Sequence, residues 1–569
     1  MIILSILFLP VLLFGIELKS LYFEGNHAFT SSELYDALAL KRASFIAFWK
    51  SKIPKINPKT ALVLKESLEG FYQVKGFYKA RIAVTQNQKK IIFRIKENKP
   101  VIVKNIDIRS DEKINDLIFL DKGNRFDAEL FIKSKKQIKE KMLKLGYCSY
   151  DLNAKAKVDP QKNLAYLHFF LKKGEICKFG DITLSGLETI KPKIIKSYIS
   201  FHKGDDYSYD KIIKSYDALY SLGAFSSVTI KETQKINNVL KMNISFRERK
   251  KKIRLKTGIG YESDLGPRAF LRWEERNFRG NAKKLAFFLK YSQKEHIFKN
   301  ELTKPALFAV KGHLFNLKNE AGYSYFDYDT YKEKTLFDKI HLFHSFGYYL
   351  VDIGVGIENI KISDVKNLCN IEEKSYLLIY PFLSFIRDSR DSRLNPRNGT
   401  YFSHYMEGGL KEFGSDTSYI KMEDEGRFIY TFSNRITLAL KAKIKIIKEL
   451  KKDLPESKML FGGGAYGNRA YGYKKLYATD ALCSDMGGKT FVENTIEISH
   501  PIYKEIEGAV FLDSTMLSAD SFDFSTDFIH SFGFGVRYIS PIGPVKLDFG
   551  FNMEEPGINA IHFLIGQSF

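Results

Sequence analysis

The feature of this 569-residue chain that most restricts its fold is a two-residue alternation that begins near residue 252 and continues to the end. In residues 545–552 (VKLDFGFN), apolar residues alternate with polar residues or glycine at every position. Successive side chains of a strand point to opposite faces, so each run has one apolar and one polar face. We count sixteen such runs between residues 252 and 569. A soluble sandwich also alternates, but it rarely has so many strands of about 9–11 residues with charge on every inner face. The pattern predicts a 16-stranded antiparallel transmembrane β-barrel, whose closure satisfies every backbone group in lipid.

The first half of the chain contains an internal repeat of a different kind. Three segments each begin with a short alternating strand, continue with a polar helix start and a second helix, and end with two strands. The second helix of each segment ends at a glycine, Gly76, Gly146 or Gly223, and these are 70 and 77 residues apart. Such a period indicates an array of small domains, here α+β units of about 75 residues. Each glycine suits a left-handed helix C-cap.

The N-terminal segment is apolar but short. Residues 2–14 (IILSILFLPVLLF) contain no charge, and no Lys or Arg precedes Lys19. Thirteen residues are too few to span a bilayer as a helix, but they match the core of a signal peptide. A buried first strand is the alternative, although nothing alternates there. We expect residues 1–15 to be a signal peptide and the protein to be exported without a helical anchor.

The charge of +23 is unevenly distributed. Residues 1–250 carry 45 Lys and Arg against 26 Asp and Glu, whereas residues 251–569 carry 44 against 40. A basic first half fits nucleic acid, an acidic partner, an anionic membrane surface or simply a solvated lysine-rich face. No CxxC, HExxH, GxxxxGK[ST] or GxSxG motif occurs, so the sequence gives no support to zinc, P-loop or hydrolase chemistry. We therefore expect no cofactor, no metal and no enzymatic activity.

Four cysteines are too few for a disulfide-built scaffold. Cys148 and Cys177 flank the strand pair of the second repeat, and a hairpin turn near residues 159–161 would bring residue 148 opposite about residue 173. Cys369 and Cys483 are expected in the fourth and sixth extracellular loops, in an oxidising compartment. For both pairs, a disulfide and free thiols remain open.

Four further segments carry a family resemblance. They are residues 387–401 (RDSRDSRLNPRNGTY), 461–473 (FGGGAYGNRAYGY), 540–545 (SPIGPV) and 561–569 (IHFLIGQSF). In this order, and after three repeats, they resemble the BamA/TamA outer-membrane assembly superfamily, whose repeats are POTRA domains. The resemblance implies POTRA-like domains at 17–99, 100–175 and 176–249, with an insertion at 43–54 in the first, followed by the barrel at 252–569. Three POTRA domains resemble TamA, whereas BamA-like chains carry five and two-partner secretion transporters carry two.

The resemblance also implies a function and partners. A TamA-like protein would assist the insertion and folding of β-barrel proteins, particularly autotransporters, in the outer membrane. Its partners would be outer-membrane lipid, unfolded outer-membrane protein substrates and a TamB-like inner-membrane protein docked on the POTRA domains, with no nucleic acid. The alternatives are a two-partner-secretion-type transporter and a shortened BamA that acts as the main insertase.

The first candidate site implied by the family is a lock between a loop and the barrel wall. The sixth loop, residues 448–490, would fold back into the barrel and carry a Val/Ile-Arg-Gly-aromatic motif, which here reads NRAY at 468–471. Arg469 and Tyr471 match this motif. If the replaced glycine needs a positive φ, Ala470 would be strained, and Gly472 would take over the turn. The partner of Arg469 would be Asp513, two residues after Phe511 on a strand whose alternation turns both side chains into the lumen. An ordinary surface loop is the alternative, and a wetted lumen would weaken the pair.

The second implied site is a lateral gate between the first and last barrel strands, residues 252–262 and 559–569. Gly258, Gly260 and Gly566 would weaken packing there, although they equally suit a close backbone approach. Phe563, Ile565 and Phe569 would form the C-terminal signal.

Overall fold

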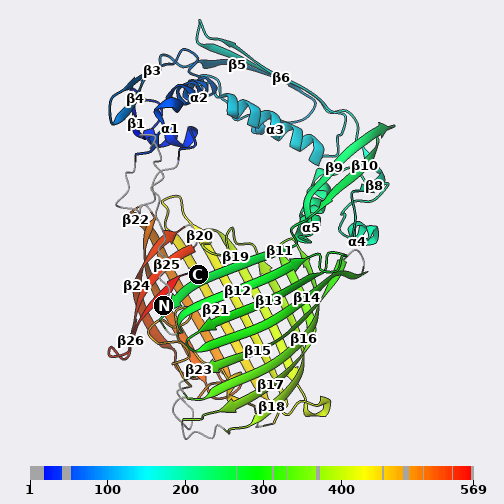
Figure 1. The fold of residues 1–569 in the computed structure, drawn as a ribbon, viewed down its shortest axis with the longest axis vertical. Coiled ribbons are helices and arrows are strands. Elements are labelled where there is room, and N and C mark those ends of the chain that lie inside the picture. Colours follow the sequence, from blue (N-terminus) through cyan, green and yellow to red (C-terminus); the bar gives the residue numbers. More distant parts are fainter. Residues whose placement is uncertain are drawn as a thin grey trace, which may run out of the picture. The chain divides into compact units, whose positions relative to one another are not determined.

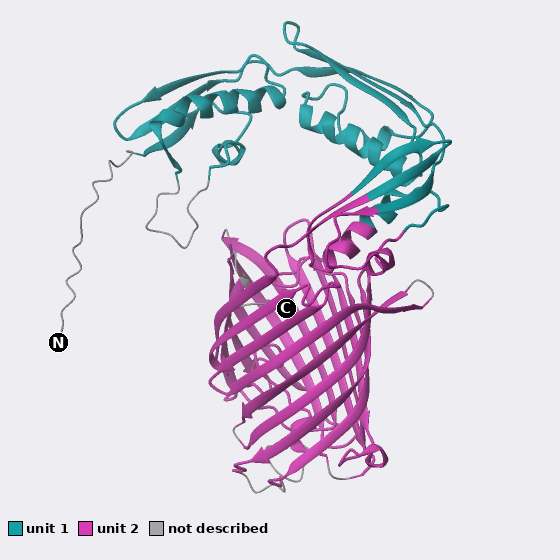
Figure 2. Ribbon diagram, turned by 45° about the vertical axis from the view of Figure 1, so that its right-hand side comes forward, with its two compact units in different colours: residues 1–183, 201–214, 230–243 teal, residues 184–200, 215–229, 244–569 magenta. Residues whose placement is uncertain are grey.

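In the computed structural model, the described residues are 18–40, 53–263, 265–310, 313–328, 330–366, 372–451, 454–478, 486–503, 505–540 and 543–565. The predicted signal peptide, Cys369, Cys483, Gly566 and Phe569 lie outside these ranges. The chain divides into two compact units, and the division passes through the third repeat (Figure 2). Unit 1 contains residues 1–183, 201–214 and 230–243, and unit 2 contains residues 184–200, 215–229 and 244–569. None of the described helices is both long and apolar enough to cross a membrane.

The first repeat is a four-stranded sheet covered by helices (Figure 1). Its elements are β1 (Lys19–Glu24), α1 (Ser31–Ala37), β2 (Lys55–Ile56), η1 (Pro58–Thr60), α2 (Ala61–Val74), β3 (Arg81–Gln86) and β4 (Lys90–Lys96). The strand order is β2-β1-β4-β3, with β1 and β4 parallel. Thr30 begins α1 with a capping box, because its hydroxyl accepts from the Glu33 amide while the Glu33 carboxylate accepts from the Thr30 amide.

The second repeat lacks the first helix that the sequence predicts. Its elements are β5 (Ile102–Ser110), η2 (Asn115–Leu117), α3 (Ala128–Lys144), β6 (Asp151–Asp159) and β7 (Leu164–Lys172), in the strand order β5-β7-β6. The predicted helix start at residues 111–114 leads only to the short 3-10 turn η2. The Ser110 hydroxyl bonds to both the amide and the carbonyl of Glu112, and such local bonds compete with helix formation.

The third repeat has the predicted order of elements. They are β8 (Lys178–Ser185), α4 (Pro192–Ser197), α5 (Tyr209–Ser221), β9 (Phe225–Ile236) and β10 (Val239–Glu248), in the strand order β8-β10-β9. The glycines that end the second helices, Gly76, Gly146 and Gly223, have φ values of 91°, 89° and 70°. The predicted left-handed C-caps are therefore confirmed.

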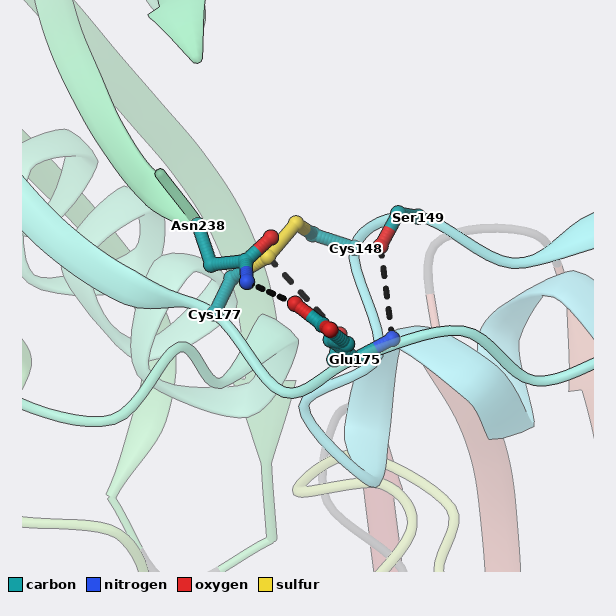
Figure 3. Close-up of a disulfide and its surroundings, with 5 residues drawn as sticks. All are labelled: Cys148, Ser149, Glu175, Cys177 and Asn238. Carbon is teal, nitrogen blue, oxygen red and sulfur yellow. Dashed lines mark hydrogen bonds between the residues drawn. A yellow bond between two sulfur atoms is a disulfide. The ribbon is translucent and has the colours of Figure 1, made fainter. Parts of the chain in front are cut away.

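Cys148 and Cys177 form a disulfide, with their Cα atoms 5.8 Å apart (Figure 3). The pairing of Asp151 with Lys172 continues the hairpin register to within two residues of the predicted one, which brings the two cysteines together. Beside them, the Glu175 amide donates to Ser149 Oγ, and the Asn238 side-chain amide donates to the Glu175 carboxylate. Since Asn238 follows β9, the disulfide and this amide together join the second repeat to the third.

Replacing Cys148 and Cys177 by serine is expected to lower the free energy of unfolding of the repeats by about 2–4 kcal/mol, because the crosslink restricts the unfolded chain. Urea unfolding of the two-residue variant against the parent chain measures this change. Cys177→Ser alone removes the same bond and should therefore show the same loss as the two-residue variant. A difference below about 0.5 kcal/mol between variant and parent would contradict the expectation.

The second half is a closed antiparallel barrel of sixteen strands, as predicted (Figure 1). The strands are β11 (Ile253–Glu262), β12 (Gly266–Arg276), β13 (Lys284–Ser292), β14 (Glu295–Val310), β15 (His313–Asp327), β16 (Lys332–Phe346), β17 (Tyr349–Ser363), β18 (Ser375–Asp388), β19 (Gly399–Gly409), β20 (Tyr419–Thr431), β21 (Thr437–Glu449), β22 (Thr490–Tyr503), β23 (Ile506–Ser518), β24 (Ile529–Ser540), β25 (Gly543–Asn552) and β26 (Asn559–Ile565). Two 3-10 turns, η3 (Lys411–Phe413) and η4 (Glu456–Lys458), lie in loops. Many strands are longer than predicted, up to the 16 residues of β14.

Unit 2 also contains the junction between the third repeat and the barrel. The Glu248 carboxylate, at the end of β10, accepts from the backbone amides of Glu188, Thr189 and Ile190 at 3.0, 2.9 and 3.2 Å. It also accepts from the side-chain amide of Asn277, in the turn after β12, at 3.2 Å. One carboxylate therefore ties the segment before α4 to a turn of the barrel.

This junction is expected to loosen in acid. Partial burial alone would raise the pKa of Glu248, but the hydrogen bonds from Thr189 and its neighbours lower that pKa below the ordinary glutamate value. A lowered pKa means that ionised Glu248 contributes stability above the ordinary value, and that this contribution is lost as the pH falls through the folded pKa. Hydrogen exchange at Thr189 and Ile190 should be slow at pH 7 and accelerate, after correction for intrinsic rates, at pH values below the ordinary range of a glutamate.

Glu248→Gln should give fast exchange at pH 7 already, whereas replacing the exposed Glu232 of the same repeat by glutamine should change nothing. Equal protection in the parent and in Glu248→Gln across this pH range would contradict the assignment.

Candidate functional site in the barrel lumen

The sixth loop runs from the end of β21 to the start of β22, and its described central residues are buried although they belong to no strand. Asn468, Arg469 and Ala470 are at most 3% exposed. The turn before them uses Gly463 and Gly464, whose φ values are 89° and 99°. Ala470 and Gly472 do not have positive φ, so the strain considered for Ala470 does not arise and Gly472 does not make the turn.

Arg469 forms a bidentate salt bridge with Asp513. Nε donates to Asp513 Oδ2 at 2.9 Å and Nη2 donates to Oδ1 at 3.0 Å, while the Arg469 backbone amide also donates to Oδ2 at 3.1 Å. The predicted contact is thus present, and Phe511 and Asp513 lie on the lumen face of β23 as predicted. Phe511 and Asp513 are 5% and 0% exposed, whereas the intervening Leu512 is 39% exposed on the outer face.

Arg469 belongs to a cluster of six charges, which we call the anchor cluster. It contains Arg469, Arg537 and Lys546 with Glu497, Asp513 and Asp548. Arg469 Nη1 lies 2.6 Å from Glu497 Oε2 and 3.4 Å from Asp548 Oδ2. Three cations against three anions are neutral in sum, which reduces the large cost of removing them from water. Because the pair is buried, the expectation that a wetted lumen weakens it is wrong.

The wall around Arg469 is shaped to receive the loop. The guanidinium lies over the Phe511 ring, 3.3 Å from its centroid. A Cβ atom on Gly550 of β25 would lie 2.0 Å from the Arg469 carbonyl oxygen, a distance no real side chain tolerates. Gly550 therefore leaves the space that the loop backbone occupies.

Polar contacts extend this attachment to the last three strands. Ser531 of β24 donates to the Asn468 side chain at 2.7 Å. The Asn552 side-chain amide at the end of β25 donates to the Tyr471 hydroxyl at 2.6 Å. His562 Nε2 of β26 lies 3.2 Å from the Arg469 carbonyl oxygen, so the loop reaches the closing strand itself.

A second attachment point lies on another part of the wall. Lys458, in η4, places its ammonium 2.7 Å from Glu358 of β17 and 3.4 Å from Glu407 of β19. Tyr419 donates to Glu407 at 3.0 Å, and Tyr380 and Tyr405 also donate to these two glutamates. The loop is thus held at two separate places, by the buried Arg469 and by Lys458, whose side chain is 12% exposed.

Sequence reasoning missed Lys458, Glu358, Glu407 and Gly550. The alternation of side chains along β17 and β19 directs Glu358 and Glu407 into the lumen, and this alternation could have identified them from the sequence. No local pattern singles out Lys458 among the lysines near the loop, because its partners are decided by the path of the loop backbone.

The barrel closes at the seam between β11 and β26. β11 pairs with β12 along its whole length, and among the described residues it pairs with β26 through Glu262 and Leu564, while residues 566–569 lie outside the described ranges. Arg268 adds a hydrogen bond to the Ile565 carbonyl at 3.1 Å, and the Tyr261 and Phe563 rings lie 6.0 Å apart. A Cβ on Gly258 would lie 2.2 Å from the Phe270 ring on β12, which favours the close-approach interpretation of this glycine. A Cβ on Gly260 would lie 3.0 Å from Arg268 Nε.

A closed sixteen-stranded barrel that follows three α+β repeats and holds an inserted loop by a buried arginine defines a class, the POTRA-bearing outer-membrane barrels. The Omp85 superfamily domain matches residues 277–569, and the surface antigen variable number repeat, POTRA, matches residues 16–98, 99–174 and 177–249. The chain belongs to the Omp85 superfamily. Its barrel is an outer-membrane barrel, and its POTRA repeats are periplasmic.

Individual relatives are distant. The outer membrane protein assembly factor BamA of Nitratidesulfovibrio vulgaris (strain Hildenborough) is 21% identical over 488 residues, which are 81% of this chain and 61% of that protein. A relative from Treponema pallidum (strain Nichols) is 22% identical over 291 residues, 46% of this chain and 34% of that relative. The chain thus spans about three fifths and one third of the length of these curated relatives. The crystal structure of BamA from Haemophilus ducreyi lacking POTRA domains 1–3 has a TM-score of 0.62 at 16% identity, covers 82% of this chain and all of that one, and supports the fold.

Proposed function

We propose that this protein is an outer-membrane protein assembly factor with a TamA-like role, which assists the insertion and folding of β-barrel proteins, including autotransporters. The observation that carries the proposal is the architecture: three POTRA repeats precede a barrel that closes between its first and last strands, where Glu262 of β11 pairs with Leu564 of β26. An unfolded strand in lipid has unpaired backbone groups, and a strand edge offered by the barrel satisfies them.

We propose that the seam between β11 and β26 opens as a lateral gate, and that its two sides have different roles because the sixth loop is anchored to the β26 side. The loop is attached to β26 through the contact between His562 and the Arg469 carbonyl, and to β23 and β25 through the anchor cluster. The closing side of the seam is thereby braced. In the proposed mechanism β11 is the strand that moves away, and Gly260 makes it easier to bend.

The POTRA repeats take the role of a docking array in this proposal. A sheet edge accepts an extended chain by backbone pairing without a catalytic group. The strand orders leave β3 at one edge of the first sheet and β6 at one edge of the second. We propose that unfolded outer-membrane proteins and a TamB-like inner-membrane partner bind there, with outer-membrane lipid around the barrel.

The decisive experiment locks the seam. Cysteines at Glu262 and Leu564, which pair directly, form a disulfide when oxidised. The crosslinked protein in lipid vesicles should fold a urea-denatured β-barrel substrate no faster than protein-free vesicles do, and reduction should restore the rate. Folding is scored by the heat-dependent gel mobility of the substrate.

Each single-cysteine variant, oxidised and reduced, controls for loss of the native side chain and for opening of the Cys148–Cys177 disulfide. Full activity of the crosslinked protein would refute the gate, and a parent protein no better than empty vesicles would refute the assembly role. Conductance separates the secretion-transporter alternative, because a lumen occupied by the sixth loop should conduct little and a secretion pore more.

A further inference from the structure

Strands β14 to β17 are neighbours in the barrel wall (Figure 1) and carry polar side chains on its outer, lipid-facing side. Leu336 and Ile340 of β16 are 61% and 55% exposed on that side, so Asp338 between them faces lipid as well. The strand register brings amides of the neighbouring strands to the same face. Together they form what we call the polar patch, which consists of Asn300, Asn319, Asp338 and Asn359.

The polar patch lies between two rows of aromatic rings on the outer wall. On the periplasmic side the Phe308 and Phe315 rings stack 5.2 Å apart, and on the opposite side the His296 and Tyr325 rings lie 5.2 Å apart. Rows of this kind border an apolar band about 25 Å tall in outer-membrane barrels. Asn319 lies between Phe315 and Tyr325 on β15, so the patch is within the apolar band, where water does not satisfy its polar groups.

Asp338 is the charged member of the polar patch. Its carboxylate accepts a hydrogen bond from the side-chain amide of Asn319, which also donates to the Lys339 carbonyl oxygen at 3.4 Å. Within the described residues, this carboxylate forms no further hydrogen bond and no ion pair. By contrast, Asp424, which faces lipid from β20, is bound by His404 of β19 at 2.8 Å. A carboxylate that faces lipid without a cation marks a site where a partner supplies the missing donors.

The wall is hollowed at the polar patch. An open hollow of about 520 Å³ is lined by residues of all four strands, among them Asn300, Asp338 and Asn359. In the register, Ala321 stands between Asn300 and Asp338, and its small side chain keeps the floor of the hollow low. An acyl chain would fill this space without a hydrogen bond to any of these groups. The hollow therefore suits a protein surface that brings its own donors and acceptors.

The polar patch is complementary to itself. Its β14–β15 half offers the amide of Asn300 and its β16–β17 half offers the amide of Asn359, and neither side chain has a hydrogen bond within the described residues. Each half also offers an acceptor, the side-chain oxygen of Asn319 and the carboxylate of Asp338. A two-fold axis along the membrane normal, placed between β15 and β16, sets each half against the opposite half of a second copy. Every donor then meets an acceptor, and the two carboxylates stay apart.

We propose that the protein forms a homodimer in the outer membrane through the polar patch. In this dimer Asn300 donates to Asp338 of the second copy across the small Ala321, and Asn359 donates to Asn319 of the second copy. A foreign membrane segment with one basic residue would bind Asp338 alone and leave both free amides in lipid. The strands β11, β12 and β13 separate the patch from the seam, so the dimer leaves the proposed gate open to lipid.

Sedimentation equilibrium of the full-length protein in density-matched detergent micelles tests the proposal. The parent should be a dimer in equilibrium with its monomer. Asp338→Leu and Asn359→Leu should each raise the dissociation constant about tenfold or more, because each change acts twice in a two-fold interface. Asp338→Asn keeps an acceptor and should retain most of the affinity. These variants should fold, since leucine is favourable at a lipid-facing position, and heat-dependent mobility verifies this.

Asn494→Leu is the matched control, because Asn494 is exposed on the same outer side of β22 as Ile496, away from the polar patch. It should leave the dissociation constant unchanged. A short bismaleimide crosslinker then locates the interface. In a chain that also carries Cys369→Ser and Cys483→Ser, Ala321→Cys should give a covalent dimer because it lies beside the proposed axis, whereas Asn494→Cys should not.

Three results would each overturn the proposal: a parent that sediments as a monomer at every concentration, equal dissociation constants for Asp338→Leu and Asn494→Leu, or no crosslink through Ala321→Cys. A complex with a different membrane protein at the polar patch would overturn it as well.

Discussion

Arg469→Ala and Asp513→Ala are each expected to destabilise the barrel by about 3–5 kcal/mol and to impair assembly activity, while the POTRA repeats stay folded. The reason is burial: the two residues are 3% and 0% exposed, so removing either leaves the other as an uncompensated charge. The double variant should lose much less than the sum, because it removes both charges. Stability is measured from the temperature at which the folded gel band is lost, and activity from substrate folding in vesicles.

Arg393→Ala provides the matched control, since Arg393 pairs with Asp388 at 3.5 Å with its own side chain 85% exposed. Pairs of this kind contribute about 0–1 kcal/mol. If the loss of stability in the double variant equalled the sum of the losses in Arg469→Ala and Asp513→Ala, the two residues would act independently despite their contact.

Lys458→Met is expected to have a comparable effect at the other attachment point of the sixth loop. The variant removes the cation that Glu358 and Glu407 share, and leaving the buried Glu407 without this partner costs about 3–5 kcal/mol. Lys339 lies 3.2 Å from Glu358 and would compensate only that glutamate. Heat-dependent mobility again gives the measurement.

Adding Glu358→Gln and Glu407→Gln to Lys458→Met should recover part of the loss, because two neutral amides then replace the two buried carboxylates. Lys451→Met, in the same loop but exposed, should have no measurable effect. If Lys458→Met resembled Lys451→Met, the loop would be held by the anchor cluster alone.

The barrel and the pair between Arg469 and Asp513 were predictable from the sequence because both depend on a one-dimensional rule. Alternation fixes the face of every strand residue, so the inward direction of Asp513 follows from its neighbours alone. The resemblance of residues 468–471 to the family's loop motif then identified Arg469 as the partner of Asp513.

What the sequence did not reveal depends on how distant segments meet. The contacts of Lys458 with Glu358 and Glu407 exist because the loop backbone crosses the lumen, and the clearance at Gly550 exists because that backbone presses on β25. The missing helix of the second repeat has a local cause, the hydrogen bonds of Ser110 to Glu112. Helix propensities do not predict which of two competing local hydrogen-bond patterns forms. The disulfide stayed open for the same reason as the loop contacts, since it required the packing of β6 against β7.

The position of Arg469 along the chain imposes an order of events on the formation of the barrel. Asp513, Asp548, Gly550 and His562 all follow Arg469 in the sequence, so its binding place does not exist until the final hairpins have formed. The anchor cluster is therefore completed together with or after the final hairpins, so the attachment of the sixth loop reports that the last strands of the barrel are in place.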